Sequence, residues 1–204
     1  MQVVFWLVVV VAAYFLGNIN GALLISRSLM KDDVRTHGSG NAGLTNFFRT
    51  YGGFQSLLVI VIDVIKCVLA CLIAGWLLPG YGMFAKMVAG AVCIVGHSYP
   101  VLENFRGGKG IMSGFAMALA TDWKVAVIIL VVFVLTVVLT RFVSLGSVLA
   151  ATAFAIGYLV LHWGDLPVCI VAVITAAFVI FRHRQNILRL FKGTESKLTF
   201  HKKS

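Results

Sequence analysis

The sequence predicts an all-α integral membrane protein, a bundle of seven transmembrane helices. Hydrophobic residues make up 60% of the 204 residues and charged residues only 12%. The mean hydropathy is +0.99. A chain of this composition has too little polar surface to coat a water-soluble globule and is too apolar to be disordered. Its apolar residues also form long runs, and about 20 such residues are enough for one helix to cross a bilayer.

Seven apolar runs are the expected helices. They cover residues 3–25, 54–78, 83–99, 110–121, 124–140, 143–163 and 166–181. The first run has no basic region ahead of it and no clear small-residue cleavage site, so we expect it to be retained rather than removed as a signal peptide. Because no internal repeat or polar linker separates the runs, we expect one membrane-embedded domain over residues 1–204.

The fourth run is short for a span, and a re-entrant segment would also fit its length. The positive-inside rule favours a crossing. If all seven runs cross, fourteen of the 17 Lys and Arg residues share one side, and the connections on the opposite side offer only Lys124. A re-entrant fourth run would move Arg141 and the basic tail to the outside. We therefore expect seven spans, with the N-terminus outside and the C-terminus in the cytoplasm.

The net charge of +10 would indicate a nucleic-acid ligand in a soluble protein. In a membrane protein it first reports topology, so no nucleic-acid partner is expected. All four cysteines lie inside apolar runs, where a free thiol behaves as a small hydrophobe, and we expect neither a metal site nor a redox site. These cysteines are Cys67, Cys71, Cys93 and Cys169.

The first polar stretch, HGSGNAGLTNFFR, begins at His37 between the first two runs. Its glycines permit backbone conformations that turn successive N–H groups toward an anion. By itself such a loop would fit an ordinary turn equally well. The stretch also carries four neutral donors and a guanidinium fork that suits phosphate; these are Ser39, Asn41, Thr45, Asn46 and Arg49.

The second polar stretch comprises GHSYP, which begins at Gly96, and FRGGKG, which leads into the fourth run. A helix N-terminus that faces the cytoplasm would place unpaired N–H groups and the positive end of the helix beside Lys109. The spacing is not that of a nucleotide-binding G-x-x-x-x-G-K-[ST] loop, and no strand precedes it. We interpret His97 as a hydrogen-bonded interfacial histidine rather than a catalyst.

The third polar stretch, RHRQNILR, begins at Arg182 and is followed by GTESK. If the last helix continues through it, Arg182, Asn186 and Arg189 lie on one stripe, and His183 lies three residues before Asn186. We expect three further cations to anchor the chain to anionic headgroups: Arg184, Lys202 and Lys203.

Ser144 adds a fourth polar element at the start of the sixth helix, as a helix cap or a phosphate donor. All four elements lie on the side predicted to be cytoplasmic, so one shared site is the economical interpretation. That site is cationic, rich in neutral donors and next to lipid. We expect it to bind a phosphorylated small molecule together with an apolar partner that reaches it through the membrane.

The three stretches resemble the cytoplasmic motifs of the bacterial acyl-phosphate:glycerol-3-phosphate acyltransferases, in order and over nearly the whole chain. The resemblance implies a plasma-membrane (inner-membrane) enzyme with seven transmembrane helices, no cofactor, no obligatory protein partner and an active site on the cytoplasmic side. The implied reaction moves an acyl chain from acyl phosphate to the 1-hydroxyl of sn-glycerol 3-phosphate. Its products are lysophosphatidic acid and phosphate, in the first acylation step of phospholipid synthesis.

Position by position, the resemblance implies catalytic roles for His183, Lys109 and Ser144. The substrate-binding residues that it implies are Ser39, Asn41, Asn46, Arg49, Gly108, Gly110 and Asn186. Four positions depart from the usual pattern without removing a phosphate donor: Leu44, Cys67, Arg106 and Gln185. Glutamate is often found at the position of Gln185, so no role for a carboxylate carries over to that position.

The proton acceptor for the attacking hydroxyl stays open between His183 and a phosphate oxygen of the donor. No His-x-x-x-x-Asp pair occurs, which argues against an acyl-CoA type of acyltransferase. A transporter of a phosphorylated solute would place its site near the bilayer midplane, often within repeated halves. The donors of this chain lie instead in the predicted cytoplasmic loops, and the sequence has no internal repeat, so an enzyme is favoured over a transporter. A scaffold that only holds acidic lipids would leave the glycines unexplained.

Overall fold

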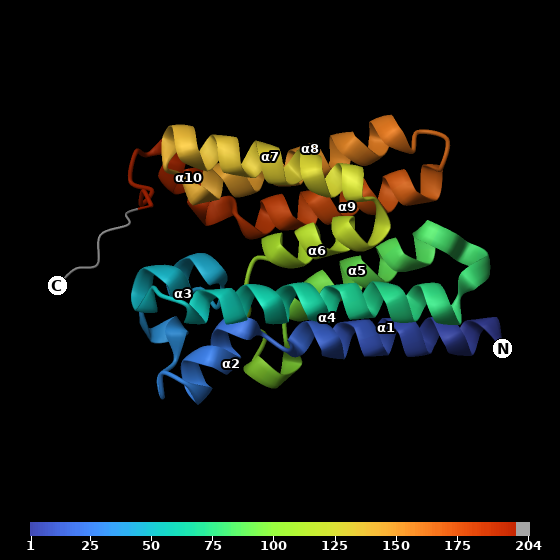
Figure 1. Cartoon of the computed structure of the whole chain (residues 1–204), viewed down its shortest axis with the longest axis horizontal. Coiled ribbons are helices and arrows are strands. Elements are labelled where there is room, and N and C mark those ends of the chain that lie inside the picture. Colours follow the sequence, from blue (N-terminus) through green and yellow to red (C-terminus); the bar gives the residue numbers. More distant parts are fainter. Residues whose placement is uncertain (199–204) are drawn as a thin grey trace.

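The computed structural model of the protein describes residues 1–198 and is helical throughout, with no strand in that range (Figure 1). Lys202 and Lys203 lie outside the described residues. The helices are α1 (Gln2–Asn18), α2 (Gly21–Ser28), α3 (Leu44–Tyr51), α4 (Gln55–Leu77), α5 (Gly82–Ser98), α6 (Ile111–Thr121), α7 (Trp123–Thr140), α8 (Val143–Leu161), α9 (Leu166–Arg182) and α10 (Arg184–Phe191). Short 3-10 turns occupy Val34–Thr36, Pro79–Tyr81 and Val101–Glu103.

Each predicted apolar run contains a helix. Within the described residues, four helices are long and apolar enough to cross a bilayer, or six if each of the bent pairs α1–α2 and α9–α10 counts as one span. Helix α6 has 11 residues and is therefore about 16 Å long, roughly half the thickness of the hydrocarbon core. The all-helical membrane class is confirmed, whereas the seven-span count and the orientation stay predictions.

Two predicted helices are bent, by 42° between α1 and α2 and by 58° between α9 and α10. Asn20 caps α2 by accepting a hydrogen bond from the Leu23 N–H at 3.0 Å, so the first apolar run does not continue as one straight helix. The second bend occurs at His183. It breaks the single stripe that was expected for Arg182, Asn186 and Arg189.

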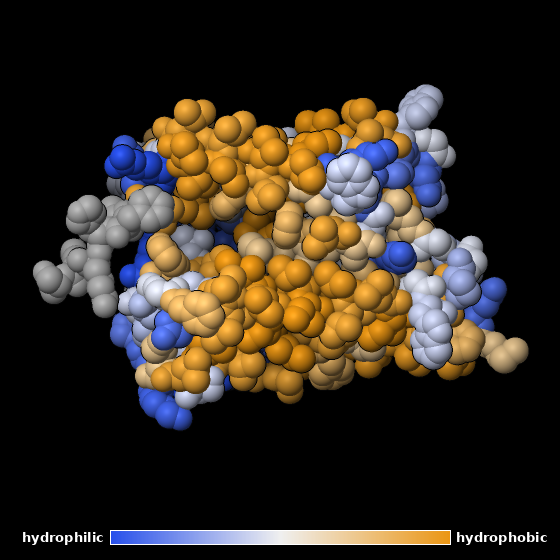
Figure 2. Space-filling view, viewed as in Figure 1, coloured by the Kyte–Doolittle hydropathy of each residue, from blue (hydrophilic) through white to orange (hydrophobic). Residues whose placement is uncertain are grey.

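Helix α3 was not predicted as a helix, because it lies inside the first polar stretch. It is amphipathic: Phe47 is fully buried, while Arg49 and Thr50 are partly or fully exposed. Figure 1 shows α2, α3 and α10 together at one end of the bundle, opposite the N-terminus. We call this the α3–α10 end. A wide apolar band separates the hydrophilic residues at the two ends of the molecule (Figure 2).

Helix α6 lies in the middle of the bundle and packs against α4, α5 and α7. Its N-cap, Gly110, adopts a left-handed backbone conformation, and a Cβ there would lie 2.7 Å from a side-chain carbon of Ile94. Ile94 is one turn inside α5, so the chain enters the bundle before α6 begins. The non-helical residues before Gly110 therefore span the part of the bundle that α6 is too short to reach. The four buried cysteines lie among the helices, as predicted.

Helices α1 and α5 cross at two glycines, Gly17 and Gly96. A Cβ on Gly17 would lie 2.3 Å from the Cys93 carbonyl oxygen, and one on Gly96 would lie 2.2 Å from the Tyr14 carbonyl oxygen. Small residues allow such a close approach of two backbones. The crossing places the end of α5, with His97, against the break between α1 and α2.

We expect Gly96→Ala to lower the thermal stability of the purified protein in detergent, because the added methyl group forces α1 away from α5. Overpacking of this kind costs about 1–3 kcal/mol. Gly114→Ala is the matched control, since a Cβ there meets nothing within 4 Å. Equal melting temperatures for the two variants would contradict the crossing.

Candidate active site

A cavity of about 730 Å³ lies at the α3–α10 end and continues into the bundle. In Figure 2 a hollow separates the upper and lower helices at this end, with hydrophilic side chains visible inside it. The inner part of the cavity is apolar and is lined from α6, α7, α8 and α9, by residues that include Phe115, Ile129, Phe133, Ala151, Phe154 and Ala176.

The outer part of the cavity is polar and carries most of the residues predicted from the sequence. It is lined by Ser39, Asn41, Asn46, Arg49, Lys109, Gly110, Ser144, His183 and Asn186. A second cavity of about 210 Å³ adjoins it and adds guanidinium groups from Arg106, Arg182 and Arg184. Four segments that are distant in sequence thus meet at one cationic site.

The first polar stretch is shaped by the buried amide of Asn46. Its Nδ2 donates to the carbonyl oxygens of Val34 and His37, at 2.9 and 3.0 Å, and its Oδ1 accepts from the Ser39 N–H at 2.9 Å. A Cβ on Gly38, where φ is +55°, would lie 2.4 Å from that Oδ1. Asn46 therefore holds the loop in shape, and Ser39 and Asn41 are left to face both cavities.

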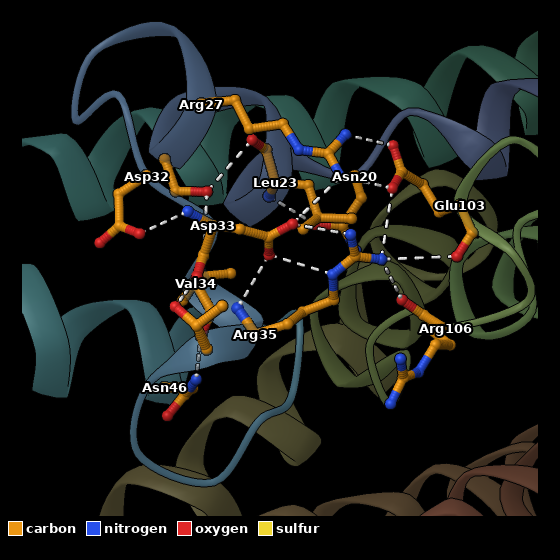
Figure 3. Close-up of polar contacts among 12 residues, drawn as sticks. Asn20, Leu23, Arg27, Asp32, Asp33, Val34, Arg35, Asn46, Glu103 and Arg106 are labelled. Carbon is orange, nitrogen blue, oxygen red and sulfur yellow. Dashed lines mark hydrogen bonds and ion pairs between the residues drawn. The ribbon is translucent and has the colours of Figure 1, made fainter.

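An ion-pair network joins the segment that precedes the first polar stretch to the turn between the two parts of the second (Figure 3). Arg35 pairs with Asp33 at 2.7 Å and with Glu103 at 3.3 Å. Arg27 pairs with Glu103 at 2.7 Å and with Asp33 at 3.2 Å. The Arg35 guanidinium holds the pKa of the Asp33 carboxyl well below its usual range. A network with paired contacts of this kind holds two loops together better than isolated surface ion pairs do.

Gly108 is the one predicted site residue that lines neither cavity. Its N–H donates to the His97 carbonyl oxygen at 3.1 Å, and its own carbonyl accepts from Arg182 Nη2 at 3.0 Å. A Cβ on Gly108 would lie 2.1 Å from His97 Nε2. The residue therefore lets the backbone pass directly over the imidazole, and this positions the next residue, Lys109.

Lys109 begins a chain of hydrogen bonds across the polar part of the cavity. Its Nζ donates to Asn186 Oδ1 at 2.5 Å, and Asn186 Nδ2 donates to Glu195 Oε1 at 2.8 Å. Arg189 Nε donates to the other Glu195 oxygen at 2.6 Å. Arg49 Nη2 reaches the Ser196 carbonyl oxygen at 2.9 Å. Residues 194–198, which follow α10, thus fold back onto the site.

Glu195 is a site residue that no sequence pattern indicates. It follows a turn at Gly193, where φ is +68°, and no helical periodicity relates it to Arg189 or Asn186. Burial opposes ionisation of Glu195, but polar contacts from Asn186, Ser144 and Arg189 outweigh it and keep the pKa of this carboxyl below its usual value. The site therefore carries a carboxylate among its cations.

Two cations at the site, Lys109 and Arg49, have lowered pKa values. Burial, followed by repulsion from Arg189, lowers the pKa of Lys109 to about 8. Burial also lowers the pKa of Arg49. An anionic ligand that reached these groups would restore the charged form of Lys109, so the site is electrostatically suited to phosphate.

His183 presents one ring nitrogen to the cavity. Its Nδ1 lies 2.8 Å from the Val179 carbonyl oxygen. Because a carbonyl oxygen can only accept, Nδ1 carries the proton and Nε2 is left as an acceptor in the neutral ring. The buried hydroxyl of Ser144 lies near the Glu195 carboxylate but makes no hydrogen bond of ordinary geometry within residues 1–198. A hydroxyl placed in this way beside a cavity is free to turn toward a ligand.

Within the part of the chain that the structure describes, no group of three or more His, Cys, Asp or Glu side chains is placed to hold a metal ion. Arg182 does not face the main cavity. Its guanidinium stacks 4.5 Å from the centre of the Tyr99 ring and donates to the Gly108 carbonyl oxygen, so it supports the second polar stretch.

The chain is similar to known proteins over nearly its whole length. A family model described as glycerol-3-phosphate acyltransferase matches residues 7–193. A protein of that name from Finegoldia magna is 38% identical over 198 residues, which cover 97% of this chain and 98% of the relative. Another from Halalkalibacterium halodurans is 39% identical over 197 residues, covering 95% of each chain.

Two solved structures have the same fold. The crystal structure of PlsY, described as an integral membrane glycerol 3-phosphate acyltransferase in its glycerol 3-phosphate form, matches with a TM-score of 0.87 and 32% identity, over 95% of this chain and 96% of that one. The lysophosphatidic acid form of PlsY matches with a TM-score of 0.83 at the same identity and over 95% of both chains.

Proposed function

Because this chain belongs to the glycerol-3-phosphate acyltransferase family, we propose that it transfers an acyl chain from acyl phosphate to the 1-hydroxyl of sn-glycerol 3-phosphate. The products would be lysophosphatidic acid and inorganic phosphate. One observation carries the proposal: a cationic, donor-rich cavity continues directly into an apolar one. A phosphate headgroup and a hydrocarbon chain fit the two parts.

The polar part suits two phosphate-bearing substrates. Arg49, Lys109 and Arg189 supply positive charge, while Ser39 and Asn41 supply neutral donors from the glycine-rich loop. Two phosphates repel each other, and fixed cations offset that repulsion while the attacking hydroxyl is oriented. Unpaired N–H groups at the start of α6 add to the positive potential.

The apolar part suits the acyl chain. Ser144 and Phe154 lie ten residues apart on α8 and both line the cavity, so it extends about 15 Å along that helix. Because the surrounding helices are apolar on their outer faces, we infer that the chain enters laterally from the lipid.

Acyl phosphate is the donor that the site chemistry favours. It is a mixed anhydride and is already activated, so placement and charge neutralisation are sufficient. No His-x-x-x-x-Asp pair of the acyl-CoA type is present: Ala42, Leu102, Pro167 and Leu188 stand five residues after the histidines at 37, 97, 162 and 183.

We assign His183 as the proton acceptor for the attacking hydroxyl. Its Nε2 accepts the hydroxyl hydrogen bond and takes the proton as oxygen attacks the acyl carbonyl carbon. Inorganic phosphate leaves as the anhydride C–O bond breaks, and its developing charge is met by Lys109 and Ser144.

We also propose the membrane orientation. The α3–α10 end carries the basic connections, among them Arg27, Arg106, Arg141 and Arg184, and by the positive-inside rule it faces the cytoplasm. Seven spans, with the N-terminus outside, follow if α6 counts as a short crossing. The enzyme then acts at the cytoplasmic face of the inner membrane.

The first test is turnover by purified protein in lipid or detergent with labelled glycerol 3-phosphate. We expect lysophosphatidic acid from palmitoyl phosphate and none from palmitoyl-CoA. Lys109→Ala should lower turnover roughly 10²–10³-fold, as loss of one stabilising donor does. Lys192→Ala, an exposed lysine outside both cavities, is the matched control. Product from palmitoyl-CoA alone would overturn the donor, and no product from either would overturn the reaction.

The pH dependence of kcat/KM for glycerol 3-phosphate should report Lys109. With its pKa at about 8, the cationic form is present below that pH and is lost as the pH rises through it. We therefore expect kcat/KM to fall above about pH 8. Lys109→Arg should move this falling limb to higher pH, because a guanidinium stays protonated. An unmoved limb in Lys109→Arg would exclude Lys109 as its source.

His183→Gln separates the two possible proton acceptors, because a glutamine oxygen accepts a hydrogen bond but does not take the proton. We expect kcat to fall roughly 10²–10⁴-fold, with KM for glycerol 3-phosphate changed only a few-fold. Unchanged thermal stability would show that the variant is folded. A kcat close to that of the wild type would assign the proton to a substrate phosphate instead.

A further inference from the structure

Three ionisable side chains lie together inside the bundle, and the proposed reaction does not use them. They are Asp63 and Lys66 on α4 and His97 on α5, with exposed fractions of 2%, 3% and 4%. Lys66 Nζ lies 2.7 Å from Asp63 Oδ1 and 2.8 Å from His97 Nδ1. A buried charge is costly even when paired, so the cluster calls for an explanation beyond stability.

The hydrogen bonds of Lys66 determine which ring nitrogen of His97 carries the proton. An ammonium has three N–H donors and no acceptor. Lys66 directs them at Asp63, at the Ile19 carbonyl oxygen 2.7 Å away and at His97 Nδ1, and the Gly17 carbonyl oxygen is a more distant acceptor at 3.4 Å. His97 Nδ1 must therefore accept, and in the neutral ring the proton is on Nε2. Asp63 also accepts from the Gly21 N–H at 3.2 Å, which ties the cluster to the helix break.

The protonated Nε2 of His97 is left for a ligand. His97 lines the main cavity. Its Nε2 has no hydrogen-bond partner among residues 1–198 and lies against Gly108, directly before Lys109. A side chain at residue 108 would cover this nitrogen, whereas glycine leaves it open. The geometry thus supplies an oriented donor, held on a nearly buried ring, beside the cation that is expected to bind phosphate.

We propose that His97 binds substrate by donating its Nε2–H to a phosphate oxygen, and that Asp63 and Lys66 are positioning residues that fix this tautomer. The inference rests on the proposed function and extends it by one binding residue. It gives the two histidines of the site opposite roles: His97 is held as a donor by Lys66, and His183 is held as an acceptor by the Val179 carbonyl oxygen.

The matched pair His97→Asn and His97→Gln tests the proposal, because the two amides imitate different ring nitrogens. Asparagine places its amide near the Nδ1 position and keeps the Lys66 contact, but offers nothing at Nε2. Glutamine reaches the Nε2 position and loses the Lys66 contact. We expect His97→Asn to raise the KM for a phosphate substrate roughly 10–100-fold, the effect of one hydrogen bond to a charged group. His97→Gln should stay within about threefold of the wild type.

KM measured separately for glycerol 3-phosphate and for palmitoyl phosphate identifies which phosphate His97 contacts, and an increase in either supports the proposal. A purely structural histidine predicts the reverse order, with His97→Gln less stable and more impaired than His97→Asn. That order, or a wild-type KM for both substrates in His97→Asn, would overturn it.

Lys66→Met tests the positioning role where the variant folds. It should raise KM in the wild-type background and add no further increase in the His97→Gln background, because an amide has no tautomer to fix. An equal increase in both backgrounds would show that Lys66 acts otherwise. The His97 pair decides the proposal if Lys66→Met does not fold.

Parallel measurements on the wild-type protein distinguish failure of the proposed reaction from failure of the proposed role of His97. Failure of the wild type to acylate glycerol 3-phosphate from any donor would refute the proposed function. Normal turnover by the wild type, together with normal KM values in His97→Asn, would refute only the role of His97.

Discussion

The cavity depends on the hydrogen bonds that the Lys66 ammonium donates. In a bilayer, backbone groups released by a helix break must find partners inside the protein. The break between α1 and α2 releases carbonyl oxygens, and Lys66 satisfies that of Ile19 from the next helix in the bundle. The glycine crossing of α1 with α5 brings His97 to the same ammonium. The second polar stretch then passes over His97 and delivers Lys109 to the site.

Electrostatic balance is the second constraint. Arg49, Lys109 and Arg189 lie around one cavity. Like charges grouped in this way repel each other and raise the free energy of the folded state. Glu195 compensates by pairing with Arg189 and, through Asn186, with Lys109. A bound phosphate would bring further negative charge to the same cations. The arrangement explains why residues 194–198 fold back over the cavity although they form no helix.

The two histidines show how a site can contain a donor and an acceptor of the same residue type. Each ring is nearly buried, and each has one nitrogen engaged by a partner of fixed character, an ammonium for His97 and a carbonyl oxygen for His183. The remaining nitrogen has the opposite character in each case. Both rings line one cavity, so a phosphate and a hydroxyl would each find the complementary group.

Hydropathy and the order of the polar stretches determined the membrane class, the position of every long helix and most residues that line the polar part of the cavity. These properties follow from local composition and from motif resemblance, which a sequence carries directly. Asn46 illustrates the limit, since its residue type suggested phosphate binding and its contacts show that it shapes the loop. The bend at His183, the return of Glu195, the position of Gly108 and the tautomers of both histidines were decided by the tertiary structure. Each depends on which carbonyl, carboxylate or ammonium from a distant part of the chain lies within hydrogen-bonding reach, and helix packing alone brings those groups together.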